Sequence, residues 1–111
     1  MRYFLICAAV TVGLPTLADE AWVPMTGADI RVALTGRAVT YASAWQSFQV
    51  LGRTVYNAGS DSWGYWRIEG DQYCSQWPPS DLWACYNTAR RGERLRFIGA
   101  SGDATDATYR E

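Results

Sequence analysis

Short runs of β-branched and aromatic residues, separated by turn residues, fill the chain from Arg37 onward. Runs of this length at hairpin spacing are typical of antiparallel strands. They lie at residues 37–41, 46–50, 53–57, 63–69, 72–75, 83–88 and 95–98, with a weaker last run at 107–110. The pattern is mainly β and predicts an antiparallel meander that curls into a half-barrel or small barrel.

One short helix is expected before the strands, over residues 27–34. Thr26 followed three residues later by Asp29 is a pattern that caps a helix N-terminus. Gly36 stands where a left-handed residue often ends a helix. Apolar residues at helical spacing share one face: Ile30, Ala33 and Leu34. We expect this face to lie on the sheet, with the helix plugging one end of the barrel or covering an edge.

The N-terminal segment has the order of a secretory signal peptide. A positively charged start precedes an apolar run at residues 4–14, and small residues follow up to Ala18. This run is shorter than the ~20 residues of a membrane span. An uncleaved anchor, or a lipoprotein modified at Cys7, is the alternative. We expect a signal peptide at residues 1–18, cleavage after Ala18, one mature domain at 19–111, no stable membrane span, and a periplasmic or secreted location.

Two cysteines, Cys74 and Cys85, remain after removal of the signal peptide. Export leads to an oxidising compartment, where such a pair tends to form a disulfide. Closing this loop should stabilise the domain by about 3 kcal/mol. A metal site would want more ligands than this chain supplies, since it has no histidine. A redox pair would usually have the Cys-x-x-Cys spacing. We therefore expect a structural disulfide, and no metal or cofactor.

The disulfide would restrain the loop at residues 76–82, which two prolines stiffen further. A stiff loop with an aromatic residue at its tip loses little entropy on binding, as suits a recognition loop. The alternative is that Trp77 folds back over the core. The candidate binding residues in and near the loop are Trp77, Pro78, Pro79, Asp81, Trp83, Trp63 and Tyr65.

Large aromatic residues point to both faces of the expected strand at 63–69. Alternation places Trp63 and Tyr65 on one face and Trp66 on the other. Gly64 lies on the Trp66 side and leaves room for a neighbour to approach. Exposed rings on the Trp63 side could stack on a sugar or contact a protein partner, although packing in the core is the alternative.

Charge is balanced, with 10 basic and 11 acidic residues, which argues against nucleic acid as a partner. Four arginines cluster near the C-terminus: Arg90, Arg91, Arg94 and Arg96. They suit a solvated turn and strand face, or alternatively a contact with an anion or lipid headgroup. Without histidine, no Ser-His-Asp or Cys-His site can form. A hydrolase using Glu69, Asp71 or Asp81 is a minor alternative, so we expect no enzymatic activity.

Four segments carry a resemblance: residues 35–41 (TGRAVTY), 62–66 (SWGYW), 70–79 (GDQYCSQWPP) and 83–86 (WACY). Together they resemble small secreted proteins of alphaproteobacteria. These proteins share a helix ending in glycine, a Gly-x-Trp strand and an Asp-x-x-Cys…Cys hairpin. The resemblance spans most of the mature chain and implies a small barrel-like fold in a Gram-negative periplasm. Its motifs describe an architecture and carry no catalytic set.

These observations predict a non-enzymatic binding domain of the cell envelope that recognises its target through the Trp77 loop and nearby aromatic residues. The target would be an envelope protein, a glycan or a small ligand. Two alternatives stay open. An inhibitor of an envelope hydrolase would have a filled core and a protruding Trp77. A carrier of a small apolar ligand would have a cavity lined by Trp and Tyr.

Overall fold

The computed structural model describes residues 21–110. The expected signal peptide, Cys7 and the cleavage after Ala18 lie outside the described residues, so they stay predictions. Among the described residues, no helix has both the length and the apolar character that a membrane span requires.

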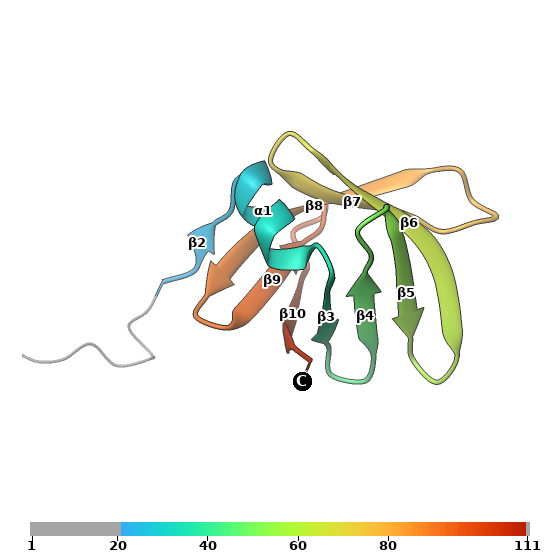
Figure 1. Cartoon of the computed structure of the whole chain (residues 1–111). Helices are drawn as coiled ribbons and strands as arrows, with labels where there is room; N and C mark the ends of the chain where they lie inside the picture. Colours follow the sequence, from blue (N-terminus) through green and yellow to red (C-terminus); the bar gives the residue numbers. More distant parts are fainter. Residues whose placement is uncertain (1–20, 111) are drawn as a thin grey trace, which may run out of the picture.

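The described chain forms a closed antiparallel barrel (Figure 1). Its strands are β3 (Arg37–Thr40), β4 (Trp45–Phe48), β5 (Arg53–Asn57), β6 (Asp61–Glu69), β7 (Gln72–Gln76), β8 (Trp83–Arg91), β9 (Arg94–Ile98) and β10 (Ala104–Tyr109). Each strand pairs with the next one along the chain, and β10 pairs with β3 to complete the circle. The predicted fold class, a mainly β meander closed into a small barrel with one helix, is confirmed.

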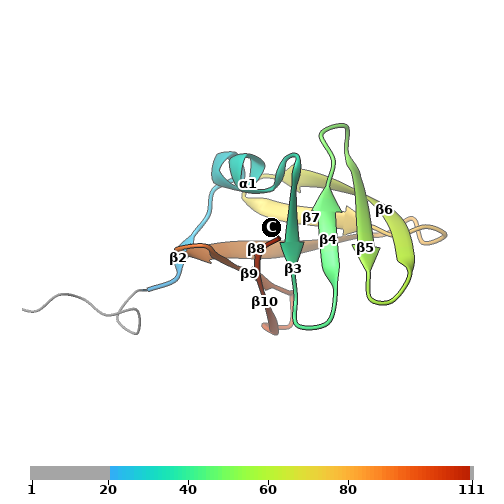
Figure 2. The same cartoon turned by 60° about the horizontal axis from the view of Figure 1, so that its bottom comes forward.

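The long strand β8 joins two parts of the barrel. Its first half pairs with β7, and its second half pairs with β9. The short strand β2 (Val23–Pro24) adds to the second half of β8, opposite Arg90 and Ala89. Figure 2 shows β2 beside the end of β8. The segment expected to be only a lead-in therefore covers an edge of β8 that would otherwise be free.

Helix α1 (Gly27–Leu34) has the predicted bounds and closes one end of the barrel. Thr26 and Asp29 form a capping box: the Thr26 hydroxyl accepts from the Asp29 amide, and the Asp29 carboxylate accepts from the Thr26 amide. Gly36 has φ 73°, the left-handed conformation expected after the helix. In Figure 1 the helix lies at the upper end, and the β3–β4 and β5–β6 turns lie at the opposite end.

The hydrophobic core fills the end of the barrel next to the helix. Ile30 and Leu34 of α1 are completely buried against side chains from several strands. Phe48 on β4 contacts the ring of Trp66 edge-on at a centroid distance of 5.6 Å, and contacts Tyr73 in the same way at 5.6 Å. We call this half of the barrel, with its plug α1, the closed end.

Several strands differ from their expected bounds. Strand β5 is as predicted, whereas β6, β8 and β10 each extend further than expected: β6 begins at Asp61, β8 continues to Arg91, and β10 begins at Ala104. The residues that the sequence pattern left out of these strands are polar or small. They can still belong to a strand, because the outward face of a strand in a closed barrel lies in solvent. The expected weak last strand is therefore a full member, and the barrel closes through it.

A candidate ligand cavity at the open end of the barrel

The end of the barrel away from α1 is not filled by side chains. It is bounded by the turns β3–β4, β5–β6 and β9–β10 and by the β7–β8 loop. A cavity of about 640 Å³ opens there, and we call this half of the barrel the open end. Its lining residues are Tyr41, Gln46, Tyr56, Ser62, Trp63, Tyr73, Ser75, Trp77, Pro78, Tyr86, Phe97 and Thr105. Seven of these twelve are aromatic and none carries a formal charge.

Burial separates a floor from a rim in this cavity. Gln46, Tyr73 and Ser75 are each 4% exposed and form the floor. Tyr56 and Tyr86 are half-buried along the walls, whereas Ser62 and Thr105 are exposed at the rim. The rings of Tyr73 and Tyr86 stack at a centroid distance of 5.9 Å. The result is an aromatic shaft that begins at the core and ends in solvent.

Gln46 organises the polar groups of the floor. Its Oε1 accepts a hydrogen bond from the Tyr41 hydroxyl at 2.6 Å. Its Nε2 donates to the Thr54 hydroxyl at 2.9 Å and to the Tyr73 hydroxyl at 3.0 Å. Thr54 in turn donates to the backbone oxygen of Ser47 at 2.7 Å. Since both hydrogens and the oxygen of the amide are used, Gln46 can be buried without a large desolvation cost.

The floor tyrosines stay protonated over the physiological range. Burial raises the pKa of Tyr73 to about 12, and the neighbouring Ser75 and Gln46 side chains oppose that rise only in part. Burial also raises the pKa of Tyr41 far above its usual value, and the neighbouring tyrosines add to that rise. The floor therefore presents neutral hydroxyls.

Trp77 is part of the cavity wall. Its ring packs edge-on against Tyr56 at a centroid distance of 6.2 Å, and its Nε1 donates to the Ser75 hydroxyl at 3.2 Å. Gly64 makes this position possible, because a Cβ there would lie 2.6 Å from the Trp77 ring and 2.6 Å from the backbone oxygen of Gln76. The neighbour for which Gly64 was expected to leave room is Trp77.

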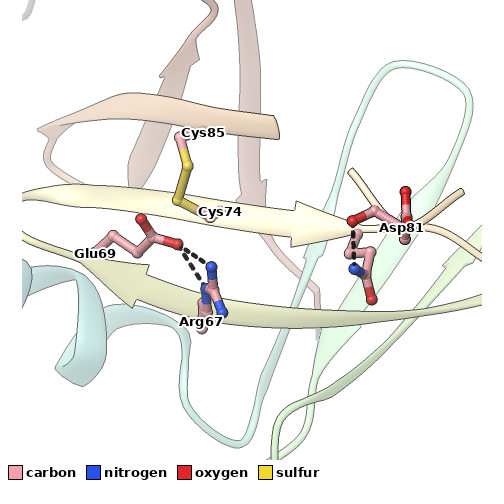
Figure 3. Close-up of polar contacts among 6 residues, drawn as sticks. Arg67, Glu69, Cys74, Asp81 and Cys85 are labelled. Atoms are coloured by element: carbon pink, nitrogen blue, oxygen red, sulfur yellow. Dashed lines mark hydrogen bonds and ion pairs between the residues drawn. A yellow bond between two sulfur atoms is a disulfide. The ribbon is translucent and has the colours of Figure 1, made fainter. Parts of the chain in front are cut away.

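The structure brings together some of the predicted binding residues and separates others. Trp63, Trp77 and Pro78 line the cavity. The remaining candidates lie away from the lining: Pro79, Asp81, Trp83 and Tyr65. Asp81 is in the exposed β7–β8 loop, where its backbone oxygen accepts from the Gln76 side chain at 2.9 Å (Figure 3).

Tyr65 and Trp83 belong to the outer face of the barrel. Tyr65 is 43% exposed and Trp63, at the rim, is 49% exposed, whereas Trp66 is buried, as the predicted alternation requires. Arginine side chains cover part of this aromatic surface. The Arg53 guanidinium lies 4.7 Å from the Trp63 ring centroid, and the Arg67 guanidinium lies 3.9 Å from that of Trp83.

The predicted disulfide between Cys74 and Cys85 is present and joins two directly opposed residues of β7 and β8. It lies on the outer face, close to Glu69, whose carboxylate is paired with Arg67 (Figure 3). Glu69 and the two sulfur atoms form a group with metal-ligand spacing among the described residues. The sulfurs are bonded to each other, so they are not thiolates and do not offer the ligands of a metal centre.

The carboxylates considered for hydrolysis do not line the cavity. Asp71 accepts a hydrogen bond from the Gly27 amide at 2.8 Å and so ties the β6–β7 turn to α1. Glu69 is paired with Arg67 on the outer face, and Asp81 lies in the exposed β7–β8 loop. That the domain is not an enzyme stays a prediction, because the positions of these carboxylates do not test it.

Sequence reasoning missed most of the cavity. Tyr56 and Tyr86 come from β5 and β8, and Tyr41 comes from the β3–β4 turn, so only barrel closure brings them together. One signal was available in the alternation: Gln46 shares a strand face with Phe48, and Ser75 shares one with Tyr73. A polar residue on an inward face marks a buried hydrogen-bond network or a lined cavity.

No protein-family model matches this chain, and no match was found among curated proteins or solved structures.

Proposed function

We propose that this domain binds a small, uncharged, aromatic molecule in the cavity at the open end of the barrel. This is the carrier alternative from the sequence, with the Trp77 loop forming part of the wall. The expected setting is the periplasm or the extracellular space, and the disulfide is consistent with an oxidising compartment.

The aromatic cavity is the observation that carries the proposal. Its volume of about 640 Å³ lies within the range of small-molecule sites, roughly 300–1,000 Å³. Burial of apolar ligand surface against the rings supplies affinity, and a few polar groups orient the ligand. The shaft combines rings on its walls with hydroxyl and amide groups on its floor.

The lining also indicates the charge of the ligand. A charged group that leaves water needs a partner of opposite charge, and the cavity contains neither a cationic nor an anionic side chain. A neutral ligand avoids this cost.

The inhibitor alternative is less well supported by the geometry. It requires a filled core and a protruding Trp77, whereas the Trp77 ring is half-buried against Tyr56 beside an open cavity. Recognition of a glycan by the outer aromatic surface is also less favoured, because the Trp63 ring already has Arg53 against it.

The test compares two dyes that differ by one charged group. N-phenylnaphthylamine is neutral, and anilinonaphthalene sulfonate has the same ring system with a sulfonate. We expect the neutral dye to bind the oxidised domain one-to-one and to fluoresce more strongly, and the sulfonate to bind at least about tenfold more weakly because its charge has no partner. No binding of the neutral dye, or equal binding of both, contradicts the proposal.

Two matched variants locate the dye. Thr105 faces inward opposite Phe97, and Thr108 lies on the other face of the same strand β10. Both residues are exposed, so either can accept a larger side chain. Thr105→Phe should narrow the mouth and weaken binding, and Thr108→Phe should leave it unchanged. Equal effects of the two variants would place the dye outside the cavity.

A further inference from the structure

The direction of the hydrogen bonds on the cavity floor follows from one backbone carbonyl. The Thr54 hydroxyl gives its hydrogen to the Ser47 backbone oxygen at 2.7 Å, so its own oxygen must accept from Gln46 at 2.9 Å. This orients the Gln46 amide with its NH₂ group toward Thr54 and its oxygen toward Tyr41. The Tyr41 hydroxyl is therefore the donor in its 2.6 Å bond to Gln46.

The same orientation decides what Tyr73 and Ser75 can do. Gln46 uses its second N–H to donate to the Tyr73 oxygen at 3.0 Å, so that oxygen is an acceptor. The indole N–H of Trp77 can only donate, so the Ser75 oxygen is an acceptor as well. Each of these two hydroxyls still has its own hydrogen to give.

At least one of these two hydrogens has no acceptor in the floor. Tyr73 and Ser75 are neighbours on the inward face of β7, and among the described residues no hydrogen bond has either hydroxyl as its donor. If Tyr73 donates to Ser75, the Ser75 hydrogen is left over, and in the reverse case the Tyr73 hydrogen is left over. Either way the floor offers a hydrogen-bond donor at the bottom of an aromatic shaft, among residues that are 4% exposed.

We propose that the ligand is a flat aromatic molecule with a neutral hydrogen-bond acceptor, such as a carbonyl oxygen, on the edge that enters the cavity first, where the Tyr73–Ser75 pair donates to it. This inference rests on the proposed function and adds a chemical class to it. A flat ring system fits walls made of Tyr56, Tyr86 and Trp77. A carbonyl satisfies the spare donor, whereas a purely hydrocarbon ligand would bury that donor without a partner.

Fluorenone and fluorene test the acceptor, because they are flat tricyclic molecules that differ only by a carbonyl in place of a methylene. A neutral hydrogen bond contributes about 0.5–1.5 kcal/mol, so fluorenone should bind the native domain about two- to tenfold more tightly than fluorene. Displacement of N-phenylnaphthylamine measures both affinities in one assay.

The outcomes separate the two proposals. If N-phenylnaphthylamine binds but fluorene competes as well as fluorenone, the acceptor inference is wrong and the proposed function stands. If the dye binds and neither tricyclic molecule competes, the inference is also wrong, because the flat class is then excluded. If the dye itself does not bind, the proposed function fails and this inference fails with it.

The carbonyl stretching band of bound fluorenone gives a second readout that does not depend on affinity. A hydrogen bond lowers the frequency of this band relative to a solution in hexane. We expect a lowered band in the native domain and in the control Tyr65→Phe, which removes a hydroxyl from the outer face, and a band closer to the hexane position in the double variant Tyr73→Phe/Ser75→Ala. A band at the hexane position in the native domain, or no difference between the double variant and the control, would overturn the inference.

Discussion

The two ends of this barrel are built from the same strands but use aromatic residues in different ways. At the closed end, Phe48 and Trp66 pack against each other and against α1, and they are 1% and 6% exposed. At the open end, Tyr56, Tyr86 and Trp77 stand around a cavity of about 640 Å³ and remain half-buried. Buried apolar surface is concentrated at the first end, whereas the second leaves aromatic surface around an open cavity.

Tyr73 marks the boundary between the two ends. Its ring contacts Phe48 in the core at 5.6 Å, and its hydroxyl takes part in the polar network of the cavity floor. The comparison shows why a high aromatic content is ambiguous in a small β domain. The same residue types supply core volume where a helix plugs the barrel and line an open cavity where none does.

The largest effect is expected from a truncation at the closed end. Leu95 is completely buried, so Leu95→Ala should lower the free energy of unfolding by about 2–5 kcal/mol through lost burial and a new void. Leu51 lies in the β4–β5 turn and is 94% exposed, so Leu51→Ala should change the free energy of unfolding by less than about 0.5 kcal/mol. Denaturant unfolding measures both variants, and equal effects would contradict the description of a packed closed end.

The disulfide should contribute almost as much, although it lies outside the core. Its cysteines are separated by 11 positions in the chain. Closing that loop lowers the conformational entropy of the unfolded chain, which stabilises the folded state by about 3 kcal/mol. Cys74→Ala/Cys85→Ala should lower the unfolding free energy by that amount. Because the bond holds the hairpin that bears Trp77, dye binding should weaken while the core packing persists. If the double variant weakens dye binding no more than Leu95→Ala does, the disulfide has no separate effect on the open end.

A smaller and more local effect is expected at the open end. Gly64→Ala would place a methyl group 2.6 Å from the Trp77 ring and from the Gln76 backbone oxygen. Moving those groups should cost about 1–3 kcal/mol. Tryptophan fluorescence should report a displaced Trp77, and dye binding should weaken. Unchanged fluorescence and unchanged binding together would show that Trp77 is not held against β6.

The ionisation of Tyr73 should have no effect at neutral pH, where it is the smallest of these effects, and above pH 10.0 it tests the boundary residue. Folding raises the pKa of Tyr73 from 10.0 to about 12 by burial. The stabilisation from the protonated phenol is thus complete below pH 10.0 and is lost as the pH rises toward about 12, because the unfolded chain ionises first. Unfolding of the native domain and of Tyr73→Phe, compared across this window, isolates the contribution. A native domain whose alkaline loss equals that of the variant would show that the phenol is not buried.

Much of the fold could be predicted from the sequence because its signals are local. The capping pair Thr26 and Asp29, the glycine at position 36 and the turns between β runs each act within a few residues. The helix bounds and the disulfide were predicted correctly for this reason. The weak β10 was underestimated because its place depends on pairing with β3 and β9, which no local pattern reports.

The cavity could not be predicted in the same way. Alternation assigns Tyr41, Tyr56 and Tyr86 to a strand face, but only barrel closure makes that face an interior. From the sequence, the helix could plug one end of the barrel or cover an edge, and only the structure distinguishes the two. Trp77 was singled out from the stiffness of its loop, yet its position depends on the absence of a side chain at Gly64 on another strand.

The most direct test of the account is to map where a neutral aromatic ligand contacts the domain, by following backbone amide shifts in two-dimensional NMR during a titration with fluorenone. We predict shift changes at the open end, centred on Tyr56, Ser75 and Tyr86, and none beyond noise at Ile30, Leu34 and Leu95. Changes centred on the closed end or spread over the outer face, or no changes at saturating fluorenone, would contradict the assignment of one end to stability and the other to binding.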